Sequence, residues 1–161
     1  MTVEASWKRR EWRVERAAWA LMVGGLALGL AGFFGGGPIS SARTDGVEGG
    51  LSASLEYERF SRSHATDDLT LRVTAPAGVE EVRFALPQDW LEQADIDSIT
   101  PQAEPQLAAG RTWFSVPVNK DGSSSVITIQ YHPRNWGSLG ADLNVVAGEK
   151  SVTLPFDQML A

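Results

Sequence analysis

The pattern of hydrophobic and polar positions changes near residue 50 of this chain. Residues 17–37 form a run of 21 positions without a charged side chain. As a helix this run would reach about 31 Å, which matches the hydrocarbon layer of a bilayer. Beyond residue 50, apolar and polar positions alternate with the two-residue period of β-strands. We therefore expect an N-terminal transmembrane helix followed by a domain that is mainly β.

Eight segments of the C-terminal part carry the strand pattern. Short, turn-rich connections such as "PAG" and "AGEK" separate several of them, as in hairpins, and "QDWLEQA" at 88–94 is long enough for a helical turn or two. This spacing predicts an antiparallel immunoglobulin-like β-sandwich, with a small barrel as the alternative. The expected strands are 51–60, 69–75, 79–86, 94–100, 111–118, 124–131, 141–146 and 151–156.

The charges are distributed unevenly, and their distribution predicts an orientation. Residues 1–16 hold five Lys/Arg against three Glu, whereas the rest of the chain holds nine basic and 17 acidic residues. By the positive-inside rule, the basic tail at 1–16 stays in the cytoplasm. The helix at 17–37 is then a single pass through the cytoplasmic (inner) membrane, and the domain at 51–161 lies in the periplasm or outside the cell. Its acidic composition disfavours a nucleic acid partner.

Residues 38–50 have the Gly, Ser and Pro content of a linker. The small residues Ser40, Ser41 and Ala42 also fit a signal-peptidase site, so a cleaved signal peptide is the alternative to an anchor. The uncharged run is longer than the 7–15 residues of a usual signal core, which favours an uncleaved anchor. Whether Ala42 is a cleavage site stays open.

Four glycines of the uncharged run are spaced by 4, 3 and 4 residues and would share one helical face. Gly25 and Gly29 form a G-x-x-x-G pair, a spacing that lets a second helix approach closely. We interpret the face as a packing surface for another integral membrane protein or for a second copy of the chain. The alternative is chance, because glycine is common in membrane helices. The four residues are Gly25, Gly29, Gly32 and Gly36.

Few residues indicate catalysis or metal binding. The chain has no cysteine, and neither of its two histidines, His64 and His132, lies in a recognised nucleophile motif. "NKDGS" at 119–123 resembles the start of a calcium loop, but the closing Glu is missing, which favours a hairpin turn. The acidic stretch 89–104 is interpreted as a solubilising face. We expect no enzyme, no cofactor, and no catalytic, cofactor-binding or metal-binding residue.

The segment "QYHPRNWGSLG" at 130–140 is a candidate partner-binding loop, although a structural role for its residues is favoured. It brings together Tyr131, Arg134 and Trp136, and these three residue types are the usual anchors of protein interfaces. A ring of this kind can also stack on a sugar. The alternative is that Trp136 covers one end of the core and that Arg134 forms surface ion pairs.

The chain resembles small bacterial single-pass membrane proteins with an extracytoplasmic β-sandwich domain. The features that carry the resemblance are the basic N-terminus, "GFFGGGPIS", "LPQDWLEQADIDSITPQ", "YHPRNWGSLG" and "SVTLPF". The resemblance implies no activity for any residue. We expect a membrane-anchored, non-enzymatic binding or accessory protein of the bacterial cell envelope. The alternative is a ligand-binding or carbohydrate-binding sensory module.

Overall fold

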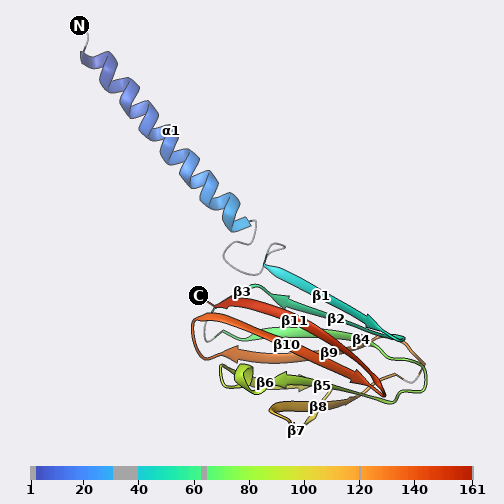
Figure 1. Cartoon of the computed structure of the whole chain (residues 1–161). Coiled ribbons are helices and arrows are strands. Elements are labelled where there is room, and N and C mark those ends of the chain that lie inside the picture. The colour runs from blue at the N-terminus through green and yellow to red at the C-terminus, as the bar shows by residue number, and fades with distance from the viewer. Residues whose placement is uncertain (1–2, 31–39, 63–64, 120, 161) are drawn as a thin grey trace. The chain divides into compact units, whose positions relative to one another are not determined.

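The computed structural model describes residues 3–30, 40–62, 65–119 and 121–160. The chain divides into two units, Met1–Ser40 and Ser41–Ala161. The first contains the helix α1 (Val3–Leu30), and the second contains a β-sandwich with the short helix α2 (Gln88–Leu91). The chain is therefore mainly β, as its alternating pattern predicts (Figure 1).

The helix α1 overturns the predicted membrane location. Among the described residues, no helix is both long and apolar enough to cross a membrane. Residues 31–37 of the expected span lie outside the described residues. The prediction of a single-pass inner-membrane protein with its C-terminal domain outside is therefore wrong.

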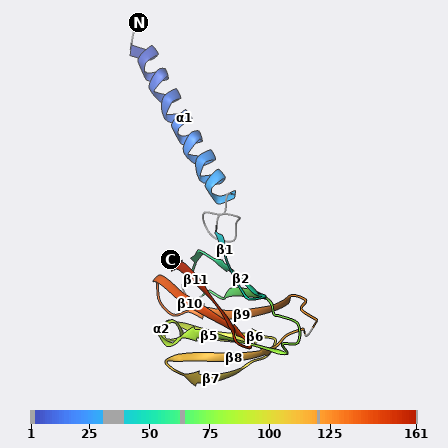
Figure 2. The same ribbon diagram turned by 45° about the vertical axis from the view of Figure 1, so that its right-hand side comes forward.

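Eleven strands of the described residues form two sheets, which identifies a sandwich rather than the alternative barrel (Figures 1 and 2). Neighbouring strands are antiparallel except for the short parallel pair β3 and β11. The five-stranded sheet has the order β1 (Ser41–Glu48), β2 (Leu51–Glu58), β4 (Asp67–Thr74), β9 (Ser125–Pro133) and β6 (Ala94–Thr100). The six-stranded sheet has the order β3 (Phe60–Ser61), β11 (Lys150–Leu160), β10 (Gly137–Ala147), β5 (Glu81–Pro87), β8 (Arg111–Pro117) and β7 (Glu104–Ala108).

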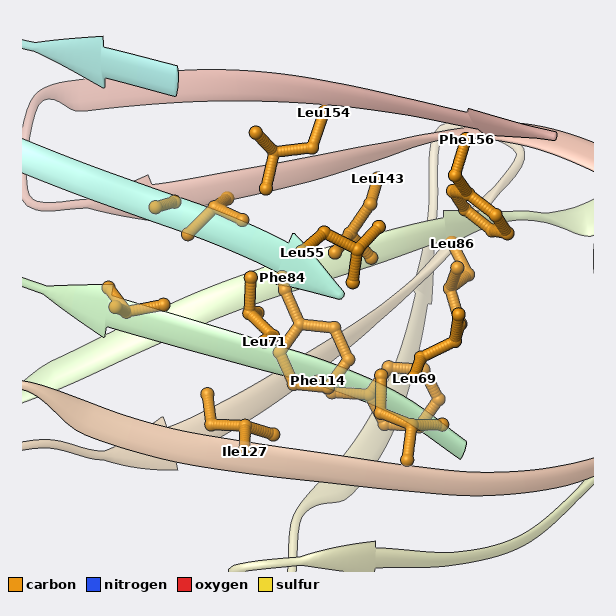
Figure 3. Close-up of a cluster of buried hydrophobic side chains, with 14 of the residues drawn as sticks. Leu55, Leu69, Leu71, Phe84, Leu86, Phe114, Ile127, Leu143, Leu154 and Phe156 are labelled. Atoms are coloured by element: carbon orange, nitrogen blue, oxygen red, sulfur yellow. The ribbon is translucent and has the colours of Figure 1, made fainter. Parts of the chain in front are cut away.

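The core fills the space between the two sheets, and its residues come from alternate positions of each strand (Figure 3). On β4, Leu69 and Leu71 are fully buried, whereas Arg72 between Leu71 and Val73 is exposed. The rings of Phe84 and Phe114 stack across β5 and β8, with 5.2 Å between their centroids. Burying this apolar surface is the main force that holds the sheets together.

All eight expected strands form, but three further strands were not predicted. The most informative of them is β1, because it lies inside the segment 38–50 that was expected to be a linker. It pairs along its whole length with β2, from Ser41 opposite Glu58 to Glu48 opposite Leu51. The hydroxyl of Thr44 donates to the carbonyl of Pro155 in β11, at 2.9 Å. The linker prediction is therefore corrected, since residues 41–48 belong to the folded domain.

Gly46 explains why this strand has the composition of a linker. A Cβ atom at this position would collide with Cγ1 of Val152 and lie 3.1 Å from Cδ2 of Leu154, both on β11. The glycine is thus required for the close approach of β1 to the other sheet. If Gly46 were needed only for flexibility in a linker, a larger side chain would fit at this position.

Gly46→Ala is expected to lower the free energy of unfolding by about 1–3 kcal/mol, because the added methyl overpacks the contact with Val152. The neighbouring Val47 is 75% exposed, so Val47→Ala should change the free energy by less than about 0.5 kcal/mol. Urea unfolding of the full chain measures both. Equal effects of the two substitutions would show that β1 does not pack as described.

Candidate functional site

The candidate site lies where β9 leaves the five-stranded sheet. β9 ends at Pro133 and β10 begins at Gly137, so only residues 134–136 connect them. We call these three residues the 134–136 tip. Trp136 is 84% exposed, the largest exposed fraction among the large hydrophobic side chains of the described residues. The alternative that Trp136 covers the core is therefore excluded.

Tyr131 does not belong to this exposed surface, which corrects its assignment as a partner-binding residue. It is fully buried because it follows Ile127 and Ile129 on the inward face of β9. Its ring packs against Trp90 of α2 with 5.0 Å between the centroids. Its hydroxyl donates to Oε1 of Gln158 at 2.5 Å, and Nε2 of Gln158 donates to the carbonyl of Glu58 at 2.7 Å. Burial, with a further contribution from Asp67, raises the pKa of Tyr131.

Arg134 connects the tip to the first residues of β6. Its guanidinium forms a two-pronged contact with Asp95, in which Nε lies 2.7 Å from Oδ2 and Nη2 contacts Oδ1. Its backbone N–H donates to the carbonyl of Gln93 at 2.8 Å. The hydrogen bond from Arg134 lowers the pKa of the Asp95 carboxyl, and Asp95 raises the pKa of Arg134. Both side chains remain about half exposed, so the pair orients the tip more than it stabilises the fold.

His132 lies between two carboxylates of β6, an arrangement that the sequence did not reveal. Its Nδ1 is 2.9 Å from Oδ1 and 3.1 Å from Oδ2 of Asp97, and its Nε2 is 3.4 Å from Oδ2 of Asp95. We call Asp95, Asp97, His132 and Arg134 the β6–β9 cluster. The four residues lie 39 positions or fewer apart in the chain, and only the pairing of β6 with β9 brings them together.

The other candidate residues do not form a site within the described residues. Asp121 of "NKDGS" accepts the backbone N–H of Ser123 at 2.9 Å, and hydrogen bonds from the side chain and the backbone of Ser123 lower the pKa of Asp121. This turn connects β8 to β9, which belong to different sheets, so the predicted hairpin is wrong. His64 lies outside the described residues. In the described part of the chain, no group of three or more His, Cys, Asp or Glu side chains is arranged to hold a metal ion.

The predicted glycine face is only partly described. Gly25 and Gly29 lie on α1, and a Cβ added to Gly25 would meet no atom within 4 Å. Gly32 and Gly36 lie outside the described residues. Helix packing through these four glycines therefore stays a prediction.

Neither of two open hollows on the described part of the sandwich includes the 134–136 tip. One, of about 390 Å³, lies over β2 and β4 and is lined by Glu56, Glu58, Asp67 and Asp68 among others. The other, of about 520 Å³, lies over β5, β7 and β8 and is also lined by carboxylates. Both are shallow and acidic, so neither has the apolar enclosure of a typical small-molecule site.

Tyr131→Phe is expected to lower the free energy of unfolding by about 1–2 kcal/mol, because it leaves the buried amide oxygen of Gln158 without its donor. It should leave any interaction made by Trp136 unchanged. Thermal and urea unfolding measure the first effect. A stability loss below about 0.3 kcal/mol would contradict the buried role assigned to Tyr131.

Asp95→Asn is expected to reduce stability at pH 6 and to have less effect at pH 2.5. The folded-state pKa of Asp95 lies below its unfolded value of about 4. Its contribution is therefore present above pH 4 and is lost as the pH falls through the folded-state pKa. Urea unfolding at both pH values measures the difference, and Arg134→Gln should reproduce it. A difference that does not depend on pH would refute the ion pair.

Comparison with known proteins assigns no family to the chain. No family model matches it, and no curated protein matches its sequence. A non-cellulosomal cohesin from the hyperthermophilic archaeon Archaeoglobus fulgidus is similar in structure, with 9% identity, 76% of this chain and 91% of that chain covered, and a TM-score of 0.45. CaCohA2 from Clostridium acetobutylicum has 6% identity, coverage of 63% and 85%, and a TM-score of 0.43. For BslA, a bacterial hydrophobin, the identity is 11%, the coverage 75% and 98%, and the TM-score 0.40.

Proposed function

We propose that the sandwich is a non-enzymatic binding module that docks onto a partner protein through the 134–136 tip. The observation that carries this proposal is the exposure of Trp136, which is 84% accessible on the connection between β9 and β10, two strands of different sheets. A tryptophan side chain is the commonest anchor of protein interfaces, because it buries a large area with little loss of conformational entropy. Because the indole ring is exposed, it is not part of the hydrophobic core.

The surroundings of Trp136 support a binding role because they hold the tip in place before a partner arrives. The backbone N–H of Arg134 is bonded to Gln93, and its guanidinium is bonded to Asp95. Both contacts join the tip to β6 and to the α2–β6 connection. A loop that is already ordered loses less entropy on association, which increases affinity.

The charge of the domain indicates what kind of surface the partner offers. Residues 41–161 hold nine Lys/Arg against 17 Asp/Glu. Asp95 and Asp97 lie in the β6–β9 cluster, and Glu92 lies beside it, with its carbonyl 3.5 Å from Nη1 of Arg134. The matching partner surface has an apolar pocket for the indole ring and basic side chains around that pocket.

A partner protein fits this surface better than a carbohydrate does. A sugar site needs polar groups that are free to bond hydroxyls beside the aromatic ring. Here Arg134, two residues before Trp136 in the chain, and Asp95 are bonded to each other. A protein partner can use the exposed indole without displacing that pair.

The first experiment places a photo-reactive benzoylphenylalanine at position 136 or, in a separate preparation, at position 107. Leu107 is the matched control because it is 73% exposed and lies on the edge strand β7, in the other sheet. We expect one defined protein to be cross-linked from position 136 in the cells that make this chain, and not from position 107.

The captured protein is then purified. The Kd of its complex with this chain is measured for wild type, Trp136→Ala, Trp136→Phe and Leu107→Ala. Trp136→Ala is expected to weaken binding by about 30-fold or more, as a central anchor does. Trp136→Phe should weaken it less, and Leu107→Ala by less than about threefold. Raised salt should also weaken binding, since the partner surface is basic.

Three results would contradict the proposal. One is the absence of a cross-linked protein at position 136. Another is equal cross-linking from positions 136 and 107. The third is a Kd for Trp136→Ala within about threefold of wild type. Circular dichroism and thermal unfolding of each variant confirm that the fold is retained.

A further inference from the structure

The most unusual polar feature of the sandwich is the position of His132 between Asp95 and Asp97. Both ring nitrogens of His132 face carboxylate oxygens, with Nδ1 at 2.9 Å from Asp97 and Nε2 at 3.4 Å from Asp95. The side chains of all three residues are 37–40% exposed, so protons exchange freely with solvent. The proposed docking role makes no use of this histidine.

A β-bulge creates the arrangement. In the pairing of β6 with β9, Asp95 lies opposite His132 and Ile96 opposite Tyr131, but Ser98 lies opposite Gln130. Asp97 is the extra residue. The hydroxyl of Ser98 bonds Oε1 of Gln130 at 3.0 Å and so continues the outward row, which leaves Asp97 free to turn back to His132. Bulges of this kind are commonly used to redirect a side chain near a functional site.

The number of protons on the ring determines how many of these contacts it can make. A neutral imidazole carries one N–H and can donate to only one of the two carboxylates, whereas the protonated ring donates to both. With a protonated ring, the β6–β9 cluster has two positive and two negative charges. Loss of the proton leaves a net charge of −1 and two carboxylates that flank a neutral ring.

Asp95 couples this proton to the 134–136 tip. Its Oδ2 is shared between His132 at 3.4 Å and Nε of Arg134 at 2.7 Å. Only Pro133 separates His132 from Arg134 in the chain. We propose that protonation of His132 tightens the attachment of the tip to β6, so that docking through Trp136 is stronger in mildly acidic than in mildly alkaline solution. This inference rests on the proposed docking role.

The charged groups around the His132 ring come from β6, from β4 and from the α2–β6 connection. His132 faces Asp95 and Asp97 of β6. The hydrogen bond from Arg134 lowers the pKa of Asp95, so this carboxylate stays ionised. Asp68 of β4 lies opposite Gln130, one outward position along the sheet, and Glu92 precedes β6. Histidine is the side chain whose ordinary charge change falls between about pH 5 and 8.

The test measures hydrogen exchange of the Arg134 amide by NMR, since this N–H bonds the carbonyl of Gln93 and reports the attachment directly. Its protection factor, corrected for the intrinsic exchange rate, is compared at pH 5.5 and pH 7.5 in the full chain. Wild type should be protected about threefold more at pH 5.5, as expected for a partly exposed ion pair.

Two substitutions should abolish this difference, and two control substitutions should not. His132→Gln removes the titrating group, and Asp97→Asn removes the carboxylate bonded to Nδ1. Asp45→Asn is the matched control, because Asp45 is an exposed, arginine-paired carboxylate on β1, at the opposite edge of the same sheet. His64→Gln controls for the other histidine.

Equal protection at the two pH values in wild type would overturn the inference, as would a pH difference that persists in His132→Gln. The hydrogen-exchange measurement uses no partner protein. A negative result would therefore leave the docking role standing, because the Trp136→Ala experiment tests that role separately. Conversely, a pH-dependent amide with no loss of binding in Trp136→Ala would sink the docking role and its pH dependence, and would leave only the effect of pH on the attachment of the tip.

Discussion

The structure of this domain depends on the burial of one face of the five-stranded sheet against one face of the six-stranded sheet. Leu71 on β4 and Ile127 on β9 pack on one side of that contact, and Phe84 and Phe114 pack on the other (Figure 3). Because alternate residues of a strand point to opposite faces, this burial also decides which residues are presented to solvent. The position of every candidate functional residue follows from it.

The consequence is clearest at the end of β9. Tyr131 continues the inward series of Ile127 and Ile129, and its hydroxyl is satisfied inside the domain by Gln158. His132 is therefore turned outward, to the face on which β6 supplies Asp95 and Asp97. A shift of the register by one residue would exchange the two, leaving a phenol in solvent and a histidine in the core.

The β6–β9 cluster also protects the edge strand β6 from pairing with other chains. β6 is at the edge of its sheet, and an unprotected edge invites pairing with other chains. A bulge and two carboxylates on β6 oppose such pairing, and the same carboxylates hold His132 and Arg134. Protection of the edge and attachment of the tip thus rely on the same residues.

Much of the fold could be read from periodicity, because burial of one sheet face leaves a period of two in the sequence. The eight expected strands all form, and Leu69, Leu71 and Val73 are buried as their alternation predicts. The strand β1 was missed because the Gly, Ser and Pro content of residues 38–50 was interpreted as that of a linker. Only the structure shows that Val152 leaves no room for a side chain at Gly46. The uncharged run near the N-terminus predicted a membrane span, yet no helix among the described residues is both long and apolar enough to cross a membrane.

The sequence by itself determined that Trp136 and Arg134 lie in a short connection after a strand, since both follow the alternating segment that ends near Tyr131. Three other features were decided only by the tertiary structure: the burial of Tyr131, the contact of Arg134 with Asp95, and the position of His132 between two carboxylates. Each depends on the pairing of β6 with β9 or on the packing of β9 over α2 and β11. Residues that are 27 to 39 positions apart meet there, and local pattern carries no information about such contacts because it records only a residue's neighbours in the chain.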